Sequence, residues 1–205
     1  MVITYLGGQC FKITQGDLTI ALNPPGKGSE QKSVKFGSDI VLSTLDHDDF
    51  NGIENASFGD REPFVINGPG EYEVKGVTVQ GFGAETSYGG KKSHNTVYLV
   101  SLENMNLCFL GALEGDIPAS AKEALDDIDI LFTPVGGKGT LDYGEAAKLA
   151  VKLEPKAIVP MQYEAATLKS FLKEAGGEDA APQEKLTVKR KDLEGKEGEV
   201  IVLQS

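Results

Sequence analysis

The chain changes its secondary-structure pattern near the middle, and this change restricts the folds that it can adopt. The first part consists of short apolar or alternating runs separated by Gly-containing turns, which is typical of β-strands in a meander. Strands are predicted there at residues 2–6, 11–14, 18–22, 39–43, 64–66, 71–74, 77–82, 96–102 and 106–110. Because the run at 39–43 is short and mostly apolar, we expect it to be buried on both faces.

Helices appear only in the second part of the chain, where apolar residues recur at helical spacing. They are predicted at 120–128, 143–153 and 164–175. Short strands accompany them at 129–132, 157–159, 186–189 and 199–203. A meander followed by alternating helices and strands suits an α/β fold of four layers, an αββα sandwich, although periodicity alone is compatible with several α/β arrangements.

The size and charge of the chain narrow its class. A chain of 205 residues buries about 70% of its unfolded surface in one core, and we expect a single domain over 1–205. The net charge of -11 opposes binding to phosphate backbones, so no nucleic acid partner is expected. No apolar run reaches the roughly 18 residues of a spanning helix. No secretory signal is visible at the amino terminus, so we expect a cytoplasmic protein with no membrane partner.

Several individual features have simple structural interpretations. Cys10 and Cys108 lie in apolar runs, which favours buried reduced thiols over a disulfide or a zinc knuckle. A catalytic thiol is less favoured, because neither cysteine has a histidine partner in sequence. The basic run 189–191 is interpreted as a solvated turn rather than a binding patch. We interpret His94 as an exposed loop residue.

Residues 43–51, Ser-Thr-Leu-Asp-His-Asp-Asp-Phe-Asn, follow the predicted buried strand and contain one of the 2 histidines of the chain. Their spacing resembles Thr-His-x-His-x-Asp-His, the pattern by which hydrolases of the metallo-β-lactamase fold aim imidazoles and a carboxylate at two metal ions. Leu45 and Phe50 stand at the first and last histidine positions. Only His47 and Asp49 keep side chains of the family type in this turn.

The resemblance to this family spans nearly the whole chain, in particular to short members similar to L-ascorbate-6-phosphate lactonase. Residues 68–77, Gly-Pro-Gly-Glu-Tyr-Glu-Val-Lys-Gly-Val, match a run common in these relatives almost residue for residue. Residues 1–13 resemble the first hairpin of the family, 109–113 resemble His-Leu-Gly-Asp-Leu, and 159–163 resemble Ile-Pro-Met-His-Tyr. The resemblance implies a metallo-β-lactamase type of αββα sandwich and a zinc-dependent hydrolase ancestry.

The same comparison implies that most metal ligands have been replaced. Gly8 and Gln162 stand at histidine positions of the family, and Asn23 and Ala112 stand at aspartate positions, of which the second bridges two metals. A further histidine near Ala84 has no counterpart that we can place. We call the matched positions the vestigial pocket: Gly8, Asn23, Leu45, His47, Asp49, Phe50, Ala112 and Gln162.

The vestigial pocket is not expected to hold zinc, because a catalytic zinc needs about three protein ligands in fixed geometry. His47 and Asp49 alone do not supply them, so we predict neither a metal ligand set nor a catalytic residue. The apolar Leu45 and Phe50 are expected to fill the vacated volume. His47 and Asp49 are expected to hydrogen-bond to each other or to nearby backbone. No cofactor is expected; zinc or another divalent ion would require a rebuilt site.

Other chemistry is less favoured. Mg²⁺ or Ca²⁺ would need oxygen ligands such as Asp46 and Asp48, which flank His47 and should point away from the side that His47 faces. The Gly-rich loop 136–140 precedes a helix and invites an anion, but it lacks P-loop spacing and matches the rim of the family's active site. Glu71 and Glu73 would share one face of a strand, which permits acid-base chemistry on spacing alone.

These observations leave competing functions. The first hypothesis is a pseudoenzyme that binds a small molecule or a protein in or near the old cleft. The second is a metal-dependent hydrolase of lactones or phosphoesters with a rebuilt or mononuclear site, and the third is a structural subunit of a homo- or hetero-oligomer. Fold similarity does not imply retained activity, so the hydrolase is ranked below the pseudoenzyme.

Overall fold

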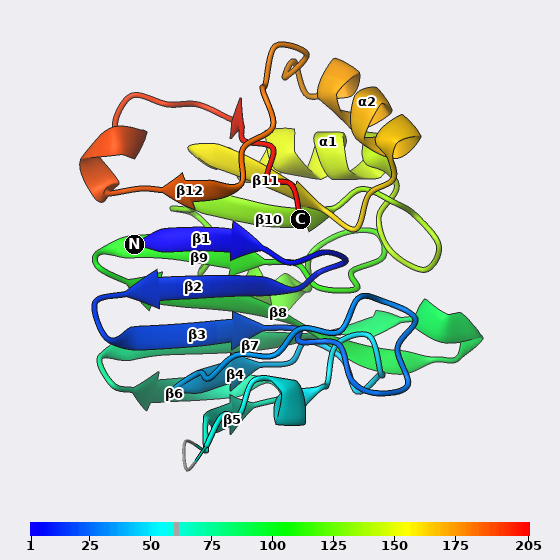
Figure 1. Cartoon of the computed structure of the whole chain (residues 1–205). Coiled ribbons are helices and arrows are strands. Elements are labelled where there is room, and N and C mark those ends of the chain that lie inside the picture. Colours follow the sequence, from blue (N-terminus) through cyan, green and yellow to red (C-terminus); the bar gives the residue numbers. More distant parts are fainter. Residues whose placement is uncertain (60–61) are drawn as a thin grey trace.

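The computed structural model describes residues 1–59 and 62–205 and contains two mixed β-sheets packed face to face (Figure 1). The first sheet has six strands in the order β12-β1-β2-β3-β4-β5. Their bounds are Val2–Tyr5 for β1, Phe11–Gln15 for β2, Leu18–Leu22 for β3, Ile40–Leu42 for β4, Phe64–Ile66 for β5 and Lys185–Thr187 for β12. Strand β4 pairs in parallel with β3 and with β5, whereas the other neighbours are antiparallel.

The second sheet has seven strands in the order β13-β11-β10-β9-β8-β7-β6. Their bounds are Gly70–Val74 for β6, Val77–Thr86 for β7, Ser93–Leu102 for β8, Met105–Phe109 for β9, Ile130–Pro134 for β10, Ala157–Met161 for β11 and Glu199–Val200 for β13. Strands β6 to β9 form an antiparallel meander, and β9, β10, β11 and β13 are parallel. The predicted change from a meander to alternating helices and strands therefore occurs within this second sheet, which continues across it.

The main core lies between the two sheets. Alternate residues of β1 and β2 are buried, because successive side chains of a strand point to opposite faces. Phe109 and Phe132 stack with ring centroids 4.1 Å apart, and Phe11 meets the Phe132 ring edge-on at 4.9 Å. These aromatic rings come from both sheets and hold the two sheets together. The strands that carry them also lead to the candidate site.

Helices cover the outer face of the second sheet. Helix α1, Tyr143–Leu153, has Asp142 as its N-cap. The Asp142 carboxylate accepts hydrogen bonds from the backbone N–H groups of Gly144 and Glu145. Helix α2, Ala165–Glu174, packs beside it. Together they bury a second apolar cluster against the sheet. Among the residues that the structure describes, no helix is long and apolar enough to cross a membrane.

The outer face of the first sheet has a thinner cover. A small apolar cluster there contains Ala21 and Val41 from β3 and β4, with Ala56 and the partly buried Phe36 and Ile53 above them. The covering segments are loops and the short 3-10 helix η1, Ile53–Asn55. The predicted αββα sandwich of two central sheets is confirmed, with the outer layer on this side built from one helical turn and loops.

One predicted helix is wrong. Residues 120–128 contain only the 3-10 turn η3, Ala119–Ala121, followed by irregular turns. Ala121, Leu125 and Ile128 are buried in the cluster beneath α1, whereas Asn106 binds the carbonyl of Asp127 at 2.9 Å. These contacts hold residues 120–128 against the sheet in an irregular conformation, so the predicted helix does not form.

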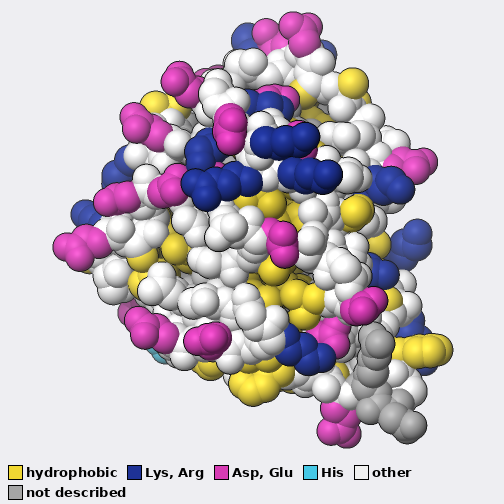
Figure 2. All heavy atoms as spheres, turned by 90° about the vertical axis from the view of Figure 1, so that its left-hand side faces the viewer, with side chains coloured by type: hydrophobic (Ala, Val, Ile, Leu, Met, Phe, Trp, Pro, Cys, Tyr) yellow, Lys and Arg dark blue, Asp and Glu magenta, His cyan; other side chains and the backbone are white. Residues whose placement is uncertain are grey.

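The basic run 189–191 and His94 also have defined places. Lys189 precedes the 3-10 helix η4, Arg190–Leu193, and its backbone N–H donates to Asp192 at 2.8 Å. Lys and Arg side chains gather in the upper half of the face shown in Figure 2, toward which η4 lies in Figure 1. His94 is exposed, but it lies in strand β8 opposite Glu85 rather than in a loop, because the β7–β8 hairpin extends further than its sequence pattern predicts.

Candidate functional site

The family positions gather at one end of the sandwich, on the right in Figure 1. Asn23 follows β3, residues 43–51 follow β4, Ala112 comes just after β9, and Gln162 directly follows β11. Carboxyl ends of parallel strands meet at one edge of a sheet, which is where ligand sites form in α/β folds. The structure therefore brings the vestigial pocket together as an apolar group and an adjoining polar group.

The apolar group fills the centre of the vestigial pocket. Leu45, Phe50 and Ala112 form a buried cluster, and the partly buried ring of Tyr88 packs against it. The Phe50 and Tyr88 rings meet edge to face with centroids 4.9 Å apart. We call these residues the apolar plug: Leu45, Phe50, Tyr88 and Ala112. Leu45 and Phe50 thus fill the pocket with apolar side chains, as predicted from their residue types.

His47 and Asp49 have hydrogen-bond partners of their own. The backbone N–H of Asp49 donates to His47 Nδ1 at 3.1 Å. His47 Nδ1 also lies 3.6 Å from Asp49 Oδ2, which is beyond hydrogen-bond distance. The Asp49 carboxylate instead accepts from Ser29 Oγ at 2.5 Å and from Tyr88 OH at 2.8 Å. This carboxylate therefore links the loop that contains Ser29 and the turn that contains Tyr88 to residues 43–51.

Tyr88 lies in the connection between β7 and β8, which contains the 3-10 helix η2, Tyr88–Gly90. From there its ring packs against the other residues of the apolar plug. Burial, followed by the hydrogen bond to Asp49, raises the pKa of Tyr88, which keeps its hydroxyl protonated as the donor. The facing loop approaches closely, since a Cβ on Gly139 would lie 2.9 Å from Tyr88 Cα. Sequence reasoning missed Tyr88, because Tyr-Gly-Gly indicates only a turn and its partners come from distant segments.

The polar group forms a network of neutral side chains, which we call the amide network: Gln9, Asn23, Thr44 and Gln162. Gln9 Nε2 donates to Gln162 Oε1 at 2.5 Å, and Asn23 Nδ2 donates to Thr44 Oγ1 at 3.0 Å and to Gln9 Oε1 at 3.4 Å. Asn23 Oδ1 also accepts the backbone N–H of Thr44 at 2.8 Å. The network joins segments from both sheets with no formal charge.

Asn95 continues these contacts on the other side of the plug. It is fully buried on β8, donates to the carbonyl of Leu110 at 2.8 Å and accepts the N–H of Ala112 at 2.8 Å. Gly111 lies between these two bonds with a φ of 61°, and a Cβ there would meet Asn95 Oδ1 at 2.3 Å. Asn95 thereby fixes the turn that positions Ala112.

Replacing Asn95 by alanine is expected to lower the free energy of unfolding by about 2–4 kcal/mol, because it leaves buried backbone groups without partners. Urea denaturation followed by circular dichroism would measure this loss. Asn51→Ala is the matched control, since the side chain of Asn51 is half-buried and its hydrogen bond of 2.9 Å to Asp46 is exposed. Equal losses in the two variants would contradict the role assigned to Asn95.

A metal ion does not fit these residues. In the described ranges, 1–59 and 62–205, no group of three or more His, Cys, Asp and Glu side chains is arranged to hold one. At Gly8 a Cβ would lie 1.9 Å from Gln31 Oε1, so the flexible Gln31 side chain would have to move before a histidine could stand there. Asp46 and Asp48, the alternative oxygen ligands, are both exposed.

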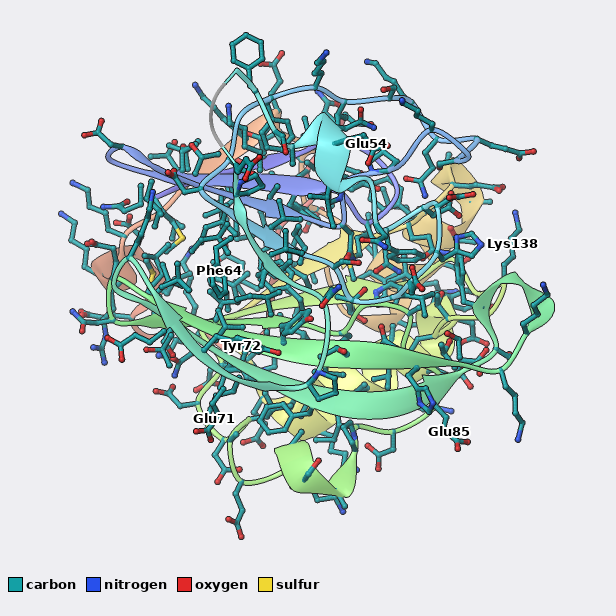
Figure 3. The ribbon with its side chains drawn as sticks, turned by 90° about the horizontal axis from the view of Figure 1, so that it is seen from below. Glu54, Phe64, Glu71, Tyr72, Glu85 and Lys138 are labelled. Carbon is teal, nitrogen blue, oxygen red and sulfur yellow. The ribbon has the colours of Figure 1, made fainter. Side chains whose placement is uncertain are left out.

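The remaining candidates lie apart from the vestigial pocket or have structural roles. Figure 3 shows Glu71 and Tyr72 on β6, away from the end of the molecule that carries Lys138. Glu71 and Glu73 are both exposed on this edge strand. Cys10 and Cys108 are buried and free, and burial raises the pKa of the Cys10 thiol to about 12. Neither thiol is prepared to act as a nucleophile.

Loop 136–140 lines a cleft of about 290 Å³ beside the amide network. The cleft also contains Gln31, Gln162 and Thr167, and an ion pair of 2.9 Å between Lys138 and Glu164 crosses its rim. Gln162 Oε1 is held by Gln9, whereas Gln31 Oε1 is buried and has no hydrogen-bond partner among the described residues. The sequence predicts this loop at the rim of the site. In the structure it lies at a polar cleft next to the apolar plug.

Comparisons with known proteins agree with this architecture. A Listeria monocytogenes protein named metal-dependent hydrolase is 27% identical over 196 residues, which cover 80% of this chain and 85% of the relative. A protein of the same name from Carboxydothermus hydrogenoformans is 26% identical over 194 residues, covering 80% and 84%.

Solved structures give the same result. A Thermotoga maritima protein of the metallo-β-lactamase superfamily has a TM-score of 0.76 and 27% identity, covering 98% of this chain and 97% of its own. A Parabacteroides distasonis protein shares the fold with a TM-score of 0.70 at 19% identity, covering 98% and 93%. The family described as beta-lactamase superfamily domain matches residues 2–162. The chain therefore belongs to the beta-lactamase superfamily, within the group that has the metallo-β-lactamase fold.

Proposed function

We propose that this protein is a catalytically inactive member of its superfamily, which binds a small molecule or a protein instead of hydrolysing a substrate. The observation that carries the proposal is the apolar plug. Side chains from three separate segments meet there, Leu45 and Phe50, Tyr88, and Ala112, and the first two and Ala112 stand at positions that we match to the family's metal ligands. Carbon atoms supply neither ligands nor charge stabilisation, and the family's hydrolysis depends on a metal-activated water.

The surrounding polar groups support the same proposal. The amide network satisfies buried donors and acceptors with neutral partners, and buried polar groups that are hydrogen-bonded need no ion to balance them. Asp49, which keeps the family's residue type, is engaged by Ser29 and Tyr88. These contacts favour a finished structural arrangement over a metal site that lacks its ion.

A binding role is supported by the cleft beside the plug. Its volume of about 290 Å³ suits a small polar molecule, and its lining includes Gln31 and Gln162. Within residues 1–59 and 62–205 the buried Gln31 Oε1 has no hydrogen-bond partner, so a ligand with an N–H or O–H group would satisfy it. We place the proposed ligand in this opening, next to the former metal centre.

Metal content is the experiment that tests the proposal. The protein purified without chelator is expected to contain substoichiometric zinc, iron, manganese and magnesium when measured by elemental mass spectrometry, with a chelator-dialysed sample as the blank. One or two tightly held ions per chain would contradict the proposal. That result would favour the alternative, a metal-dependent hydrolase with a rebuilt site, as the names of the relatives imply.

A further inference from the structure

A second cleft runs along the outer face of the first sheet and shares no lining residue with the vestigial pocket. Its volume is about 720 Å³, within the range of roughly 300–1,000 Å³ that is common for small-molecule sites. Strands β1 and β2 supply Thr4 and Lys12, and the segment 32–36 forms a wall. The cleft exists because only loops and the short η1 cover this face of the sheet.

The charge inside this cleft is opposite to that of the protein. The whole chain has 31 acidic and 20 basic side chains, but the cleft is lined by Lys12, Lys32 and Lys35 against Glu184 and the terminal carboxylate of Ser205. Clefts lined by one sign of charge concentrate the electrostatic field and attract ions of the other sign. Such a reversal is unexpected for a merely solvated surface of an acidic protein.

These lysines have no carboxylate partner in the part of the chain that the structure describes. The ion pairs of the molecule use other lysines: Lys75, Lys138, Lys152, Lys156 and Lys196. The half-buried Lys12 instead holds its ammonium 5.3 Å from the centroid of the Phe36 ring. A cation over an aromatic face is oriented but not neutralised, so its charge remains available to a ligand.

The sheet register adds a further cation to the same face. Thr4 pairs with Lys12 on one side and with Lys185 on the other. Residues directly opposite in neighbouring strands point to the same face of a sheet, so both ammonium groups lie on the outer side of β1. The apolar side chains of Leu6, Val34 and Phe36 also line the cleft, and they offer a surface for carbon atoms between the charges.

We propose that this cleft binds a small organic anion, a molecule with a phosphate, sulfonate or carboxylate group attached to an apolar or aromatic body. Lys12, Lys32 and Lys35 would bind the charged group, and the body would lie against Phe36 and Val34. The assignment is independent of the proposed function, because it involves neither the apolar plug nor the amide network.

Naphthalene-1-sulfonate is the probe that tests this assignment, with the uncharged naphthalene-1-sulfonamide as its matched control. Isothermal titration calorimetry on the whole chain is expected to show the sulfonate binding at least about tenfold more tightly, since a hydrogen bond to a charged group is stronger than one to a neutral group. Added salt should weaken binding of the sulfonate and leave that of the sulfonamide unchanged. Inorganic phosphate should bind more weakly than the sulfonate, because it lacks the apolar body.

Substitutions locate the site. Lys12→Met and Lys35→Gln remove charges from the cleft and are each expected to weaken sulfonate binding by about tenfold. Lys189→Gln removes one exposed charge outside it and should leave the affinity unchanged. Equal affinity for sulfonate and sulfonamide, or equal effects of the three substitutions, would overturn the proposal. Phosphate binding as tightly as the sulfonate would overturn the assignment of an apolar body.

Discussion

A variant with four restored ligands is expected to bind zinc tightly, whereas the wild-type protein is not: Leu45→His, Phe50→His, Ala112→Asp and Gln162→His. The substitutions return imidazoles and a bridging carboxylate to strand ends that still meet at one place, beside His47 and Asp49. Zinc binds such nitrogen and oxygen ligands when about three or more converge. The apolar plug is lost at the same time, so the metal-free variant should be less stable than the wild type.

Thermal and urea unfolding with and without zinc would measure the gain. Zinc at about 100 times its dissociation constant is expected to add about 2.7 kcal/mol to the free energy of unfolding of this variant. The control carries polar replacements that bind zinc poorly: Leu45→Gln, Phe50→Gln and Ala112→Asn, with Gln162 kept. If zinc stabilises neither variant, the correspondence between this chain and the family's ligand positions is wrong.

Phe50→Ala is expected to lower the free energy of unfolding by about 3–5 kcal/mol, the usual loss for a large aromatic side chain in a core. Phe50 is 0% exposed and packs on Leu45, Ala112 and Tyr88. The residues around it come from separate segments that are tied down by hydrogen bonds, so the cavity cannot easily collapse.

Phe58→Ala removes the same side chain from a position that is 64% exposed and is expected to change the stability by less than about 0.5 kcal/mol. Urea denaturation of both variants provides the comparison. A loss for Phe50→Ala no greater than that for Phe58→Ala would show that the plug is loosely packed, and the former metal volume would then be open to a ligand.

The sequence pattern predicts those elements whose stability is local. Helix α1 has the predicted bounds, Tyr143–Leu153, because helical spacing of apolar residues coincides with the Asp142 cap. Strand β3 likewise has the predicted bounds, Leu18–Leu22. Residues 120–128 fail as a helix because their apolar residues are anchored by a distant cluster and by Asn106, which no local pattern contains.

In the candidate site, too, some features follow from the local sequence, whereas others depend on distant contacts. Filling of the pocket by Leu45 and Phe50 follows from residue type at matched positions. Tyr88 could not be predicted, because it reaches the plug from a turn and contacts Asp49 39 residues away. Gln9 was also missed, since its bonds to Gly111 and Gln162 span 102 and 153 residues. Contacts of this range become visible only when the strands are placed.

The plug also has an evolutionary consequence. A single reversion, such as histidine at position 45 or 50, would bury a polar ring against apolar neighbours, which costs stability when no partner is present. The compensating metal would bind only where about three ligands converge, whereas the remaining Asp49 carboxylate is already engaged by Ser29 and Tyr88. Each intermediate sequence would therefore fold less well than its ancestor without any return of chemistry. If the proposed function is correct, the loss of the metal centre would therefore be difficult to reverse by single substitutions.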